Sequence, residues 1–325
     1  MGACDHILVV VDPTPYSQPA VDRAIWLGQR LGARLELFIC DYDQFLLSEQ
    51  SFDPVALEKA KRRILDRDIR KLRLLAQSVR AQGLRVSVDA RWNHPLDEGI
   101  ICKAVEVRPS IVVKDTHYHP LLKRSIFSNT DWNLIRGCPA PLLLVKPRPI
   151  SERPNVIAAV DPLHSHDKPA ELDRIILSAA NDISSEIDAD LHVIHAFDPA
   201  PAIAAAADTI ATPLASSVRV LTETLEKRHR AALQTLLEET SINSASSHVY
   251  QGGPQELLVR LAEQLEADLV VMGATSRSAL KRVFVGSTAE RVLDKLPCDV
   301  LVVKVSEVAD RLAHRICTPG ETANL

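Results

Sequence analysis

The chain has 325 residues, 46% of them hydrophobic and 25% charged, with a formal net charge of -4 and a pI near 6.3. This composition is typical of a globular protein with two domains of about 150 residues each, and the mild acidity argues against nucleic acid as a general partner. No apolar run approaches the roughly 20 residues of a membrane span, and the first residues lack a basic segment and a cleavage site. We therefore expect a cytoplasmic protein without a membrane span.

In the first half, five short strands rich in valine, isoleucine and leucine alternate with four helices. The strands are predicted over residues 6–13, 34–40, 84–92, 110–114 and 141–146. Apolar residues at helical spacing mark the first helix between Ala20 and Leu31, and a long charged helix follows over residues 54–82. The third helix opens after Pro95, because the fixed φ of proline suits a first helical turn, and the fourth precedes the last strand.

The second half repeats this order of elements. Its strands are predicted over residues 155–162, 190–197, 246–253, 268–272 and 299–304. The stretch MGATSRSALKRVFVGST, residues 272–288, aligns without a gap with KDTHYHPLLKRSIFSNT, residues 114–130. A repeat of this length indicates that the chain contains the same fold twice.

Short strands that are apolar on both faces and separated by helices predict a parallel sheet with helices on each side. The predicted fold class is therefore α/β, with two tandem doubly wound five-stranded parallel sheets of a Rossmann-like kind. The expected division is 1–147 for the first domain, 148–154 for a stiff proline-rich linker, 155–306 for the second domain and 307–325 for a C-terminal tail. In such sheets ligands bind beyond the carboxyl ends of the strands, where Asp161, Ala196 and the loop after Met272 lie.

A strand ending in aspartate, a strand with a histidine before its last residues and a loop flanked by glycines together resemble the universal stress protein family in its tandem-domain form. The family has an adenine nucleotide alpha hydrolase-like fold, and its pattern after the fourth strand is G-x-x-G-x9-G-[ST]. The second half has serine in place of the second glycine and reads Gly273, Ser276, Gly286, Ser287 and Thr288. The first half has lost both glycines of the opening pair and has Asp115, Tyr118, Ser128, Asn129 and Thr130 at the matching positions.

The resemblance implies a nucleotide site in the second half, for ATP or ADP with Mg²⁺. Asp161 would lie near the ribose and the metal–phosphate region, and the backbone of Ala196 would read the adenine edge. The ribose and phosphates would be lined by Gly273, Ser276, Gly286, Ser287 and Thr288. Glycine lets backbone N–H groups approach phosphate oxygens, and a helix N-terminus favours an anion. A glycine-flanked loop also occurs in sheets that bind nothing, and this alternative stays open.

The first half is expected to bind no nucleotide, because Asp115 would repel a triphosphate and Tyr118 would crowd it. The basic pair Lys281 and Arg282 could neutralise phosphate. However, the first half has the same two residue types at the matching positions, Lys123 and Arg124, which favours a solvated basic face.

Two pairs of histidines have the spacing of metal ligands. His117 and His119, with an oxygen from Asp12 or Asp115, form a candidate zinc site in the first half. A second pair is His164 and His166. The alternative for both pairs is a polar surface loop without a metal.

These features predict a stress-response protein whose second domain binds ATP or a related nucleotide and which acts as a ligand-responsive regulator or scaffold. One alternative is a scaffold for another small molecule, such as a lipid or sugar-nucleotide intermediate. The other is a weak Mg²⁺-dependent ATPase. The common hydrolase and P-loop motifs do not occur in the sequence, so we predict no catalytic residue.

The last predicted strand of each half is apolar and expected at a sheet edge, and exposed edges invite pairing. We therefore predict that the two fifth strands pack together, so that one chain forms an intramolecular pseudo-dimer, with a homodimer as a further possibility. Trp26, Trp92 and Trp132 are expected in core or interdomain packing.

Six cysteines occur without a C-x-x-C pair, which predicts scattered reduced thiols and neither a disulfide framework nor a zinc finger. They are residues 4, 40, 102, 138, 298 and 317. Cys40 and Cys138 border predicted strands and are expected to behave as small buried hydrophobic residues.

Overall fold

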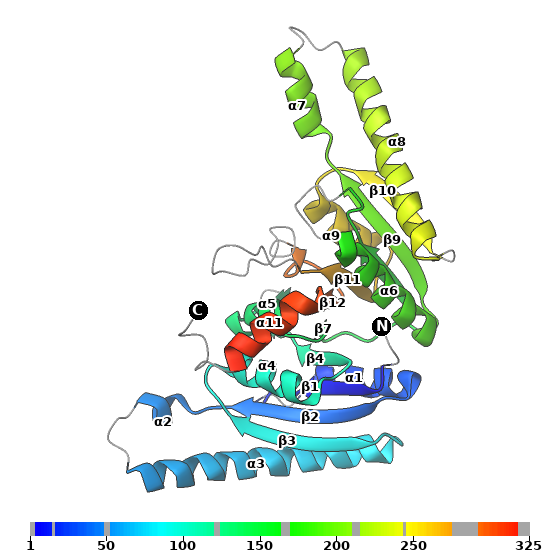
Figure 1. Cartoon of the computed structure of the whole chain (residues 1–325). Helices are drawn as coiled ribbons and strands as arrows, with labels where there is room; N and C mark the ends of the chain where they lie inside the picture. The colour runs from blue at the N-terminus through cyan, green and yellow to red at the C-terminus, as the bar shows by residue number, and fades with distance from the viewer. Residues whose placement is uncertain are drawn as a thin grey trace. The chain divides into compact units, whose positions relative to one another are not determined.

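A computed structural model describes residues 4–14, 17–48, 53–119, 124–163, 170–209, 215–242, 245–274 and 292–317. The chain divides into two compact units (Figure 1). Unit 1 comprises Met1–Pro149 together with Lys304–Leu325, and unit 2 comprises Ile150–Val303. Within the described residues, no helix combines the length and the apolar character needed to cross a membrane.

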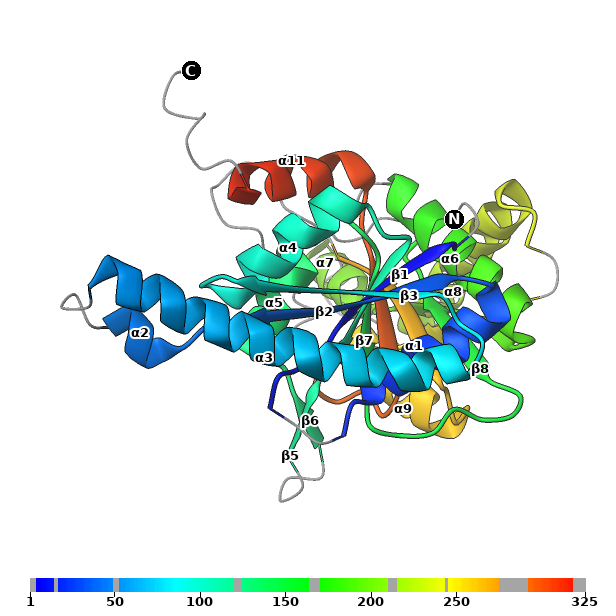
Figure 2. The ribbon, with the colours of Figure 1, turned by 90° about the horizontal axis from the view of Figure 1, so that it is seen from below.

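Unit 1 is a five-stranded parallel sheet in the order β7-β4-β1-β2-β3, with a two-stranded antiparallel hairpin, β5-β6, beside it. The strands are β1 His6–Val10, β2 Arg34–Asp41, β3 Val86–Trp92, β4 Ile111–Asp115, β5 His117–His119, β6 Arg124–Ile126 and β7 Leu142–Val145. The helices are α1 Pro19–Leu31, α2 Gln44–Ser48, α3 Pro54–Ala81, α4 Leu96–Val107, α5 Asn129–Gly137 and α11 Ser306–Cys317. Helices α1 and α3 pack on one face of the sheet, and α4 packs on the other with α5 and α11 against it (Figure 2).

Unit 2 has the same strand order, β10-β9-β8-β11-β12, and all of its described strand pairs are parallel. Its strands are β8 Asn155–Ala159, β9 Asp190–Phe197, β10 Ser246–Gln251, β11 Leu269–Gly273 and β12 Asp299–Val303. Its described helices are α6 Ala170–Ile187, α7 Ala200–Thr209, α8 Ala215–Glu239 and α9 Pro254–Gln264. The predicted fold class, two tandem doubly wound parallel sheets, is therefore confirmed.

Local chemistry explains where these elements begin. Strands β1 and β7 are buried along their whole length, as expected for strands covered by helices on both faces. Helix α3 starts with proline after Asp53, whose carboxylate accepts a hydrogen bond from the Ala56 N–H. Helix α1 ends at Gly32, which has a φ of 66° that glycine adopts without strain.

A group of buried charges joins the sheet of unit 1 to α4. The Lys103 ammonium lies 2.6 Å from a Glu36 oxygen and 2.7 Å from an Asp89 oxygen, and His6 Nε2 lies 3.1 Å from the other Glu36 oxygen. The hydrogen bond from His6, helped by Lys103, lowers the pKa of Glu36 to about 2, although burial opposes this shift. Glu36 is therefore a carboxylate at neutral pH, and its charge is balanced by Lys103.

The three tryptophans were expected in core or interdomain packing, and none of them is fully buried in the core. Each is half-buried in unit 1. The Arg30 guanidinium lies 4.1 Å from the centre of the Trp26 ring, and Trp132 packs against Phe127 with their ring centres 5.4 Å apart. A tryptophan on an amphipathic surface can bury most of its ring without entering the core.

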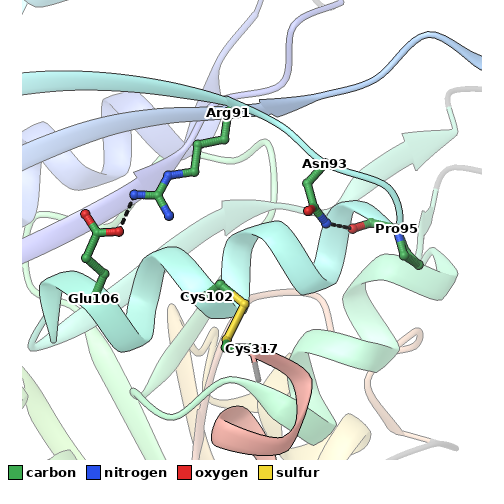
Figure 3. Close-up of a disulfide and its surroundings, with 6 residues drawn as sticks. All are labelled: Arg91, Asn93, Pro95, Cys102, Glu106 and Cys317. Carbon is green, nitrogen blue, oxygen red and sulfur yellow. Dashed lines mark hydrogen bonds and ion pairs between the residues drawn. A yellow bond between two sulfur atoms is a disulfide. The ribbon is translucent and has the colours of Figure 1, made fainter. Parts of the chain in front are cut away.

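The prediction that all cysteines are reduced thiols is wrong for two of them. Cys102 in α4 and Cys317 at the end of α11 form a disulfide, with their Cα atoms 5.4 Å apart (Figure 3). The positions of the cysteines in the sequence did not indicate this disulfide, because the two residues are 215 positions apart and meet only when α11 packs on α4. Residues 307–317 of the expected C-terminal tail belong to α11, which is part of unit 1. Cys40 and Cys138 are buried, as predicted.

We predict that Lys103→Ala lowers the free energy of unfolding of unit 1 by about 3 to 5 kcal/mol, because it leaves the Glu36 charge buried without its cation. Urea unfolding followed by tryptophan fluorescence reports on unit 1 specifically, since all three tryptophans lie there. Lys59→Ala, on the exposed face of α3, is the matched control and should change stability by less than about 0.5 kcal/mol. Equal effects of the two substitutions would show that the buried charges do not stabilise the unit.

Candidate functional site

Three predicted site residues of unit 2 come together because parallel strands carry their carboxyl ends to the same edge of a sheet. Asp161 lies two residues after β8, Ala196 is the penultimate residue of β9, and Gly273 ends β11. Strand β8 pairs with both β9 and β11, so these positions are neighbours at one edge. Ser276, Gly286, Ser287 and Thr288 lie outside the described residues, as do Lys281 and Arg282.

Asp161 has an oxygen that is buried yet unsatisfied. Its backbone N–H donates to the Asp173 carboxylate at 3.0 Å, which fixes the backbone at the end of β8. Its side-chain Oδ1 atom is buried and has no hydrogen-bond partner among the residues that the structure describes. An unpaired buried acceptor costs about 1 to 3 kcal/mol, so this oxygen is suited to accept a hydrogen bond from a ligand or to bind a cation.

A histidine pair lies beside Asp161. His195 Nδ1 is 3.1 Å from the Val160 carbonyl oxygen, and His195 Nε2 is 2.7 Å from Nδ1 of His229 in α8. Because a carbonyl oxygen can only accept, the proton of neutral His195 is on Nδ1, and Nε2 accepts from His229. His229 also stacks on Phe197, with ring centres 4.7 Å apart.

These contacts fix the orientation and the tautomer of His229. Neutral His229 donates through Nδ1, so its Nε2 atom is an acceptor, and it can gain a proton without breaking the chain of hydrogen bonds. Burial and the neighbouring His195 lower the pKa of His229, whereas the charge of Asp161 opposes this shift. His229 was not predicted, because helical spacing within α8 does not show which of its residues reaches β9.

Gly273 is required by packing rather than by an unusual backbone angle. A Cβ atom at this position would lie 2.6 Å from Cδ2 and 2.7 Å from Cγ of Leu172 in α6. The absence of a side chain therefore lets α6 approach the end of β11. This explanation is independent of any ligand, and it holds whether or not the loop that follows binds phosphate.

The matching residue of unit 1, Asp115, fills the corresponding position with a carboxylate. One of its oxygens accepts a hydrogen bond from the Ala20 N–H, 2.5 Å away, in the first turn of α1. Burial raises the pKa of Asp115 to about 7, and the charges of Asp12 and Asp22 add to this effect. Asp12, the counterpart of Asp161, accepts at 2.8 Å from both the N–H and the hydroxyl of Thr14.

A second carboxylate of unit 1 caps α5, the helix that begins after Ser128. Asp131 in α5 accepts hydrogen bonds from the N–H and the hydroxyl of Ser128, each at 2.8 Å. Asp131 is fully buried, and its other oxygen lies 2.7 Å from the Lys114 ammonium. The N-terminus of α5 is therefore already neutralised by an anion from the chain itself.

The predicted zinc ligands His117 and His119 belong to β5, which pairs with β6. Their side chains, and all of His164 and His166, lie outside what the structure describes. Among the described residues, no group of three or more histidine, cysteine, aspartate or glutamate side chains is arranged to hold a metal ion. The zinc site stays a prediction.

Comparison with known proteins agrees with the repeated fold. The model of the universal stress protein family matches residues 4–146 and 155–304. Universal stress protein E of Salmonella typhi is 29% identical over 309 residues, covering 94% of this chain and 96% of that protein. The protein of the same name from Escherichia coli K12 is 28% identical over 306 residues, covering 94% and 95%.

A solved structure shows the same likeness over nearly the whole chain. The crystal structure of a putative universal stress protein from Pseudomonas aeruginosa UCBPP-PA14 is similar with a TM-score of 0.72 and 29% identity, covering 97% of this chain and 98% of that one. Both halves of the sequence match the family model, and the strand order repeats in the two units. The chain therefore belongs to the universal stress protein family, with one family domain in each half.

Proposed function

We propose that this protein is a nucleotide-responsive regulator or scaffold of the stress response, which binds ATP or a related nucleotide in unit 2 and acts in the cytoplasm. The observation that carries the proposal is the buried Asp161 Oδ1 atom just after β8, beside the end of β9, which has no hydrogen-bond partner in the part of the chain that the structure describes. A ribose hydroxyl or a cation held by the phosphates would satisfy it. The backbone at Ala196 is placed to meet the base at the same edge.

The contrast between the two units supports a single nucleotide site. In unit 1, Asp12 is already hydrogen-bonded by Thr14, and Asp115 holds the position that glycine has in unit 2. Asp131 caps the helix where an anion would bind, and its counterpart in the gap-free alignment of the halves is Ala289. A triphosphate in unit 1 would therefore meet the Asp115 carboxyl group, and it would find the Ser128 N–H at the start of α5 already bonded to Asp131.

The site residues of unit 2 that the structure describes would have different roles in nucleotide binding. Asp161 would accept a hydrogen bond or contribute an oxygen ligand, and His195 and His229 would hold α8 against β9 beside it. Gly273 would keep α6 close to the loop that follows β11. Mg²⁺, when bound with the nucleotide, would neutralise phosphate charge, and the Asp161 carboxylate suits its preference for oxygen ligands.

The internal contacts of unit 1 favour a lost nucleotide site over a site for a different ligand. Lys71 donates to the backbone oxygens of Asp12 and Pro13 at 3.0 and 2.8 Å, so this cation is also engaged within the unit. A lipid or sugar-nucleotide ligand in unit 1 would have to displace several of these contacts. Weak ATP hydrolysis in unit 2 is the remaining alternative, and no described contact favours it.

We predict that titration of the full chain with ATP and Mg²⁺ gives one site per chain, and that Asp161→Ala weakens binding by roughly tenfold to a hundredfold. Isothermal titration calorimetry measures both quantities. Asp12→Ala, the same substitution in unit 1, is the matched control and should leave the affinity unchanged. Two equivalent sites, or equal effects of the two substitutions, would contradict the assignment to unit 2.

We also predict that Asp115→Asn stabilises unit 1, increasingly so as the pH rises. Since the folded pKa of Asp115 is about 7 and lies above the unfolded value, the folded state binds the proton more tightly, and stability falls between about pH 4 and pH 7. Asparagine keeps an acceptor for the Ala20 N–H but does not ionise. The difference in free energy of unfolding between Asp115→Asn and the parent should grow by about 2 kcal/mol between pH 5 and pH 8.

Urea unfolding followed by tryptophan fluorescence at the two pH values tests this prediction. Asp66→Asn, on the exposed face of α3, should leave the pH dependence of unfolding as it is in the parent. If the difference in free energy of unfolding between Asp115→Asn and the parent were the same at both pH values, Asp115 would not be a buried acid in solution.

A further inference from the structure

Helix α11 is fastened to unit 1 at both of its ends. Immediately before it, the buried ammonium of Lys304 donates to the carbonyl oxygens of Leu134 and Ile135 in α5, at 3.4 and 3.0 Å. At its last residue, Cys317 is bonded to Cys102 in α4 (Figure 3). The attachment before the helix consists of hydrogen bonds, and the attachment at its last residue is a covalent bond that reduction can break.

Between its ends, α11 packs on α4 and, less extensively, on α5. Ala313 is fully buried, and Ile316 lies over Gly137, where an added Cβ atom would come within 3.2 Å of Ile316 Cδ1. The helix has 12 residues, a length at which an isolated helix is only marginally stable in water. Its position on α4 and α5 therefore depends on its contacts and on the two fastenings.

The two cysteines of the disulfide are less buried than the three free cysteines of the core. Cys40, Cys138 and Cys298 are buried, and burial raises the pKa of Cys40 to about 12 and also raises that of Cys138. Such thiols rarely form the reactive thiolate. Cys102 and Cys317 are each half-buried, so their disulfide is less shielded from solvent than those three thiols are. Disulfides that solvent can reach are more often labile or regulatory than fully buried ones.

We propose that Cys102 and Cys317 form a reversible redox site, which takes low-molecular-weight disulfides as its oxidant and dithiols as its reductant, and which fastens or releases α11. The proposal is independent of nucleotide binding. In the bonded state α11 is held at both ends. In the reduced state only the Lys304 hydrogen bonds and the apolar contacts hold it, so α11 opens from α4 more often and transiently exposes the surface of α4 that it covers.

The oxidation step balances as two thiol–disulfide exchanges. The thiolate of one cysteine attacks a sulfur of the small disulfide, which forms a mixed disulfide and releases one small thiol. The thiolate of the second cysteine then attacks the protein sulfur of that mixed disulfide and releases the second small thiol. Two protein thiols are oxidised, one small disulfide is reduced, and the two protons pass to the released thiols. A dithiol reverses both steps.

The test uses the full chain in buffers of reduced and oxidised glutathione at set ratios, followed by trapping of thiols with N-ethylmaleimide and mass spectrometry of the peptides. We expect the Cys102–Cys317 peptide pair to form and disappear reversibly as the ratio changes. Hydrogen exchange should be faster in residues 306–317 of the reduced protein, by roughly tenfold or more, than in the oxidised protein.

Variants separate this site from other effects of oxidation. Cys102→Ser and Cys317→Ser should each give the fast exchange of the reduced state in any glutathione buffer, whereas Cys4→Ser should behave as the parent. Three results would overturn the proposal: no Cys102–Cys317 bond in oxidised glutathione, a bond that survives excess dithiothreitol in the folded protein, or equal exchange of α11 in the two states.

Discussion

Parallel pairing of β8 with β9 and β11 is the constraint on which the site of unit 2 depends. It brings the ends of three strands that are far apart in sequence to one edge, and it places Asp161, Ala196 and Gly273 there together. Strands β8 and β11 are apolar and buried along most of their length, as expected for inner strands of a parallel sheet that is covered on both faces. Helix α6 approaches the same edge because Gly273 leaves room for Leu172.

Unit 1 has the same pairing with different chemistry at its edge, which shows that the fold does not determine the ligand. Asp115 occupies the position where the family pattern has glycine, and it accepts a hydrogen bond from the Ala20 N–H in the first turn of α1. Asp131 accepts a hydrogen bond from the Ser128 N–H at the start of α5. In unit 1 a carboxyl group of the chain thus takes backbone N–H groups that an external anion could otherwise bind.

Much of the fold could be predicted from the sequence, because the repeat and the apolar periodicity are local signals. The strands ending near Asp12 and Asp161 and the sequence of the five sheet strands in each half were predicted in this way and agree with the structure, whereas α2, β5, β6, α7 and α11 were not predicted. Features that depend on contacts between distant segments were missed. The Cys102–Cys317 bond, the His195–His229 pair and the Lys103 charge group each join residues whose spacing in the sequence carries no information about their contact. The packing of the two fifth strands against each other stays a prediction.

We propose that unit 2, and not unit 1, binds an adenine nucleotide at the ends of its strands. Photo-crosslinking of the full chain with 8-azido-ATP, followed by mass spectrometry of the labelled peptides, would locate the bound nucleotide. We expect label on peptides of unit 2 that include the end of β9 around Ala196, and loss of that label when ATP is added in excess. Label on the matching end of β2 around Cys40, or label that ATP does not displace, would contradict this proposal.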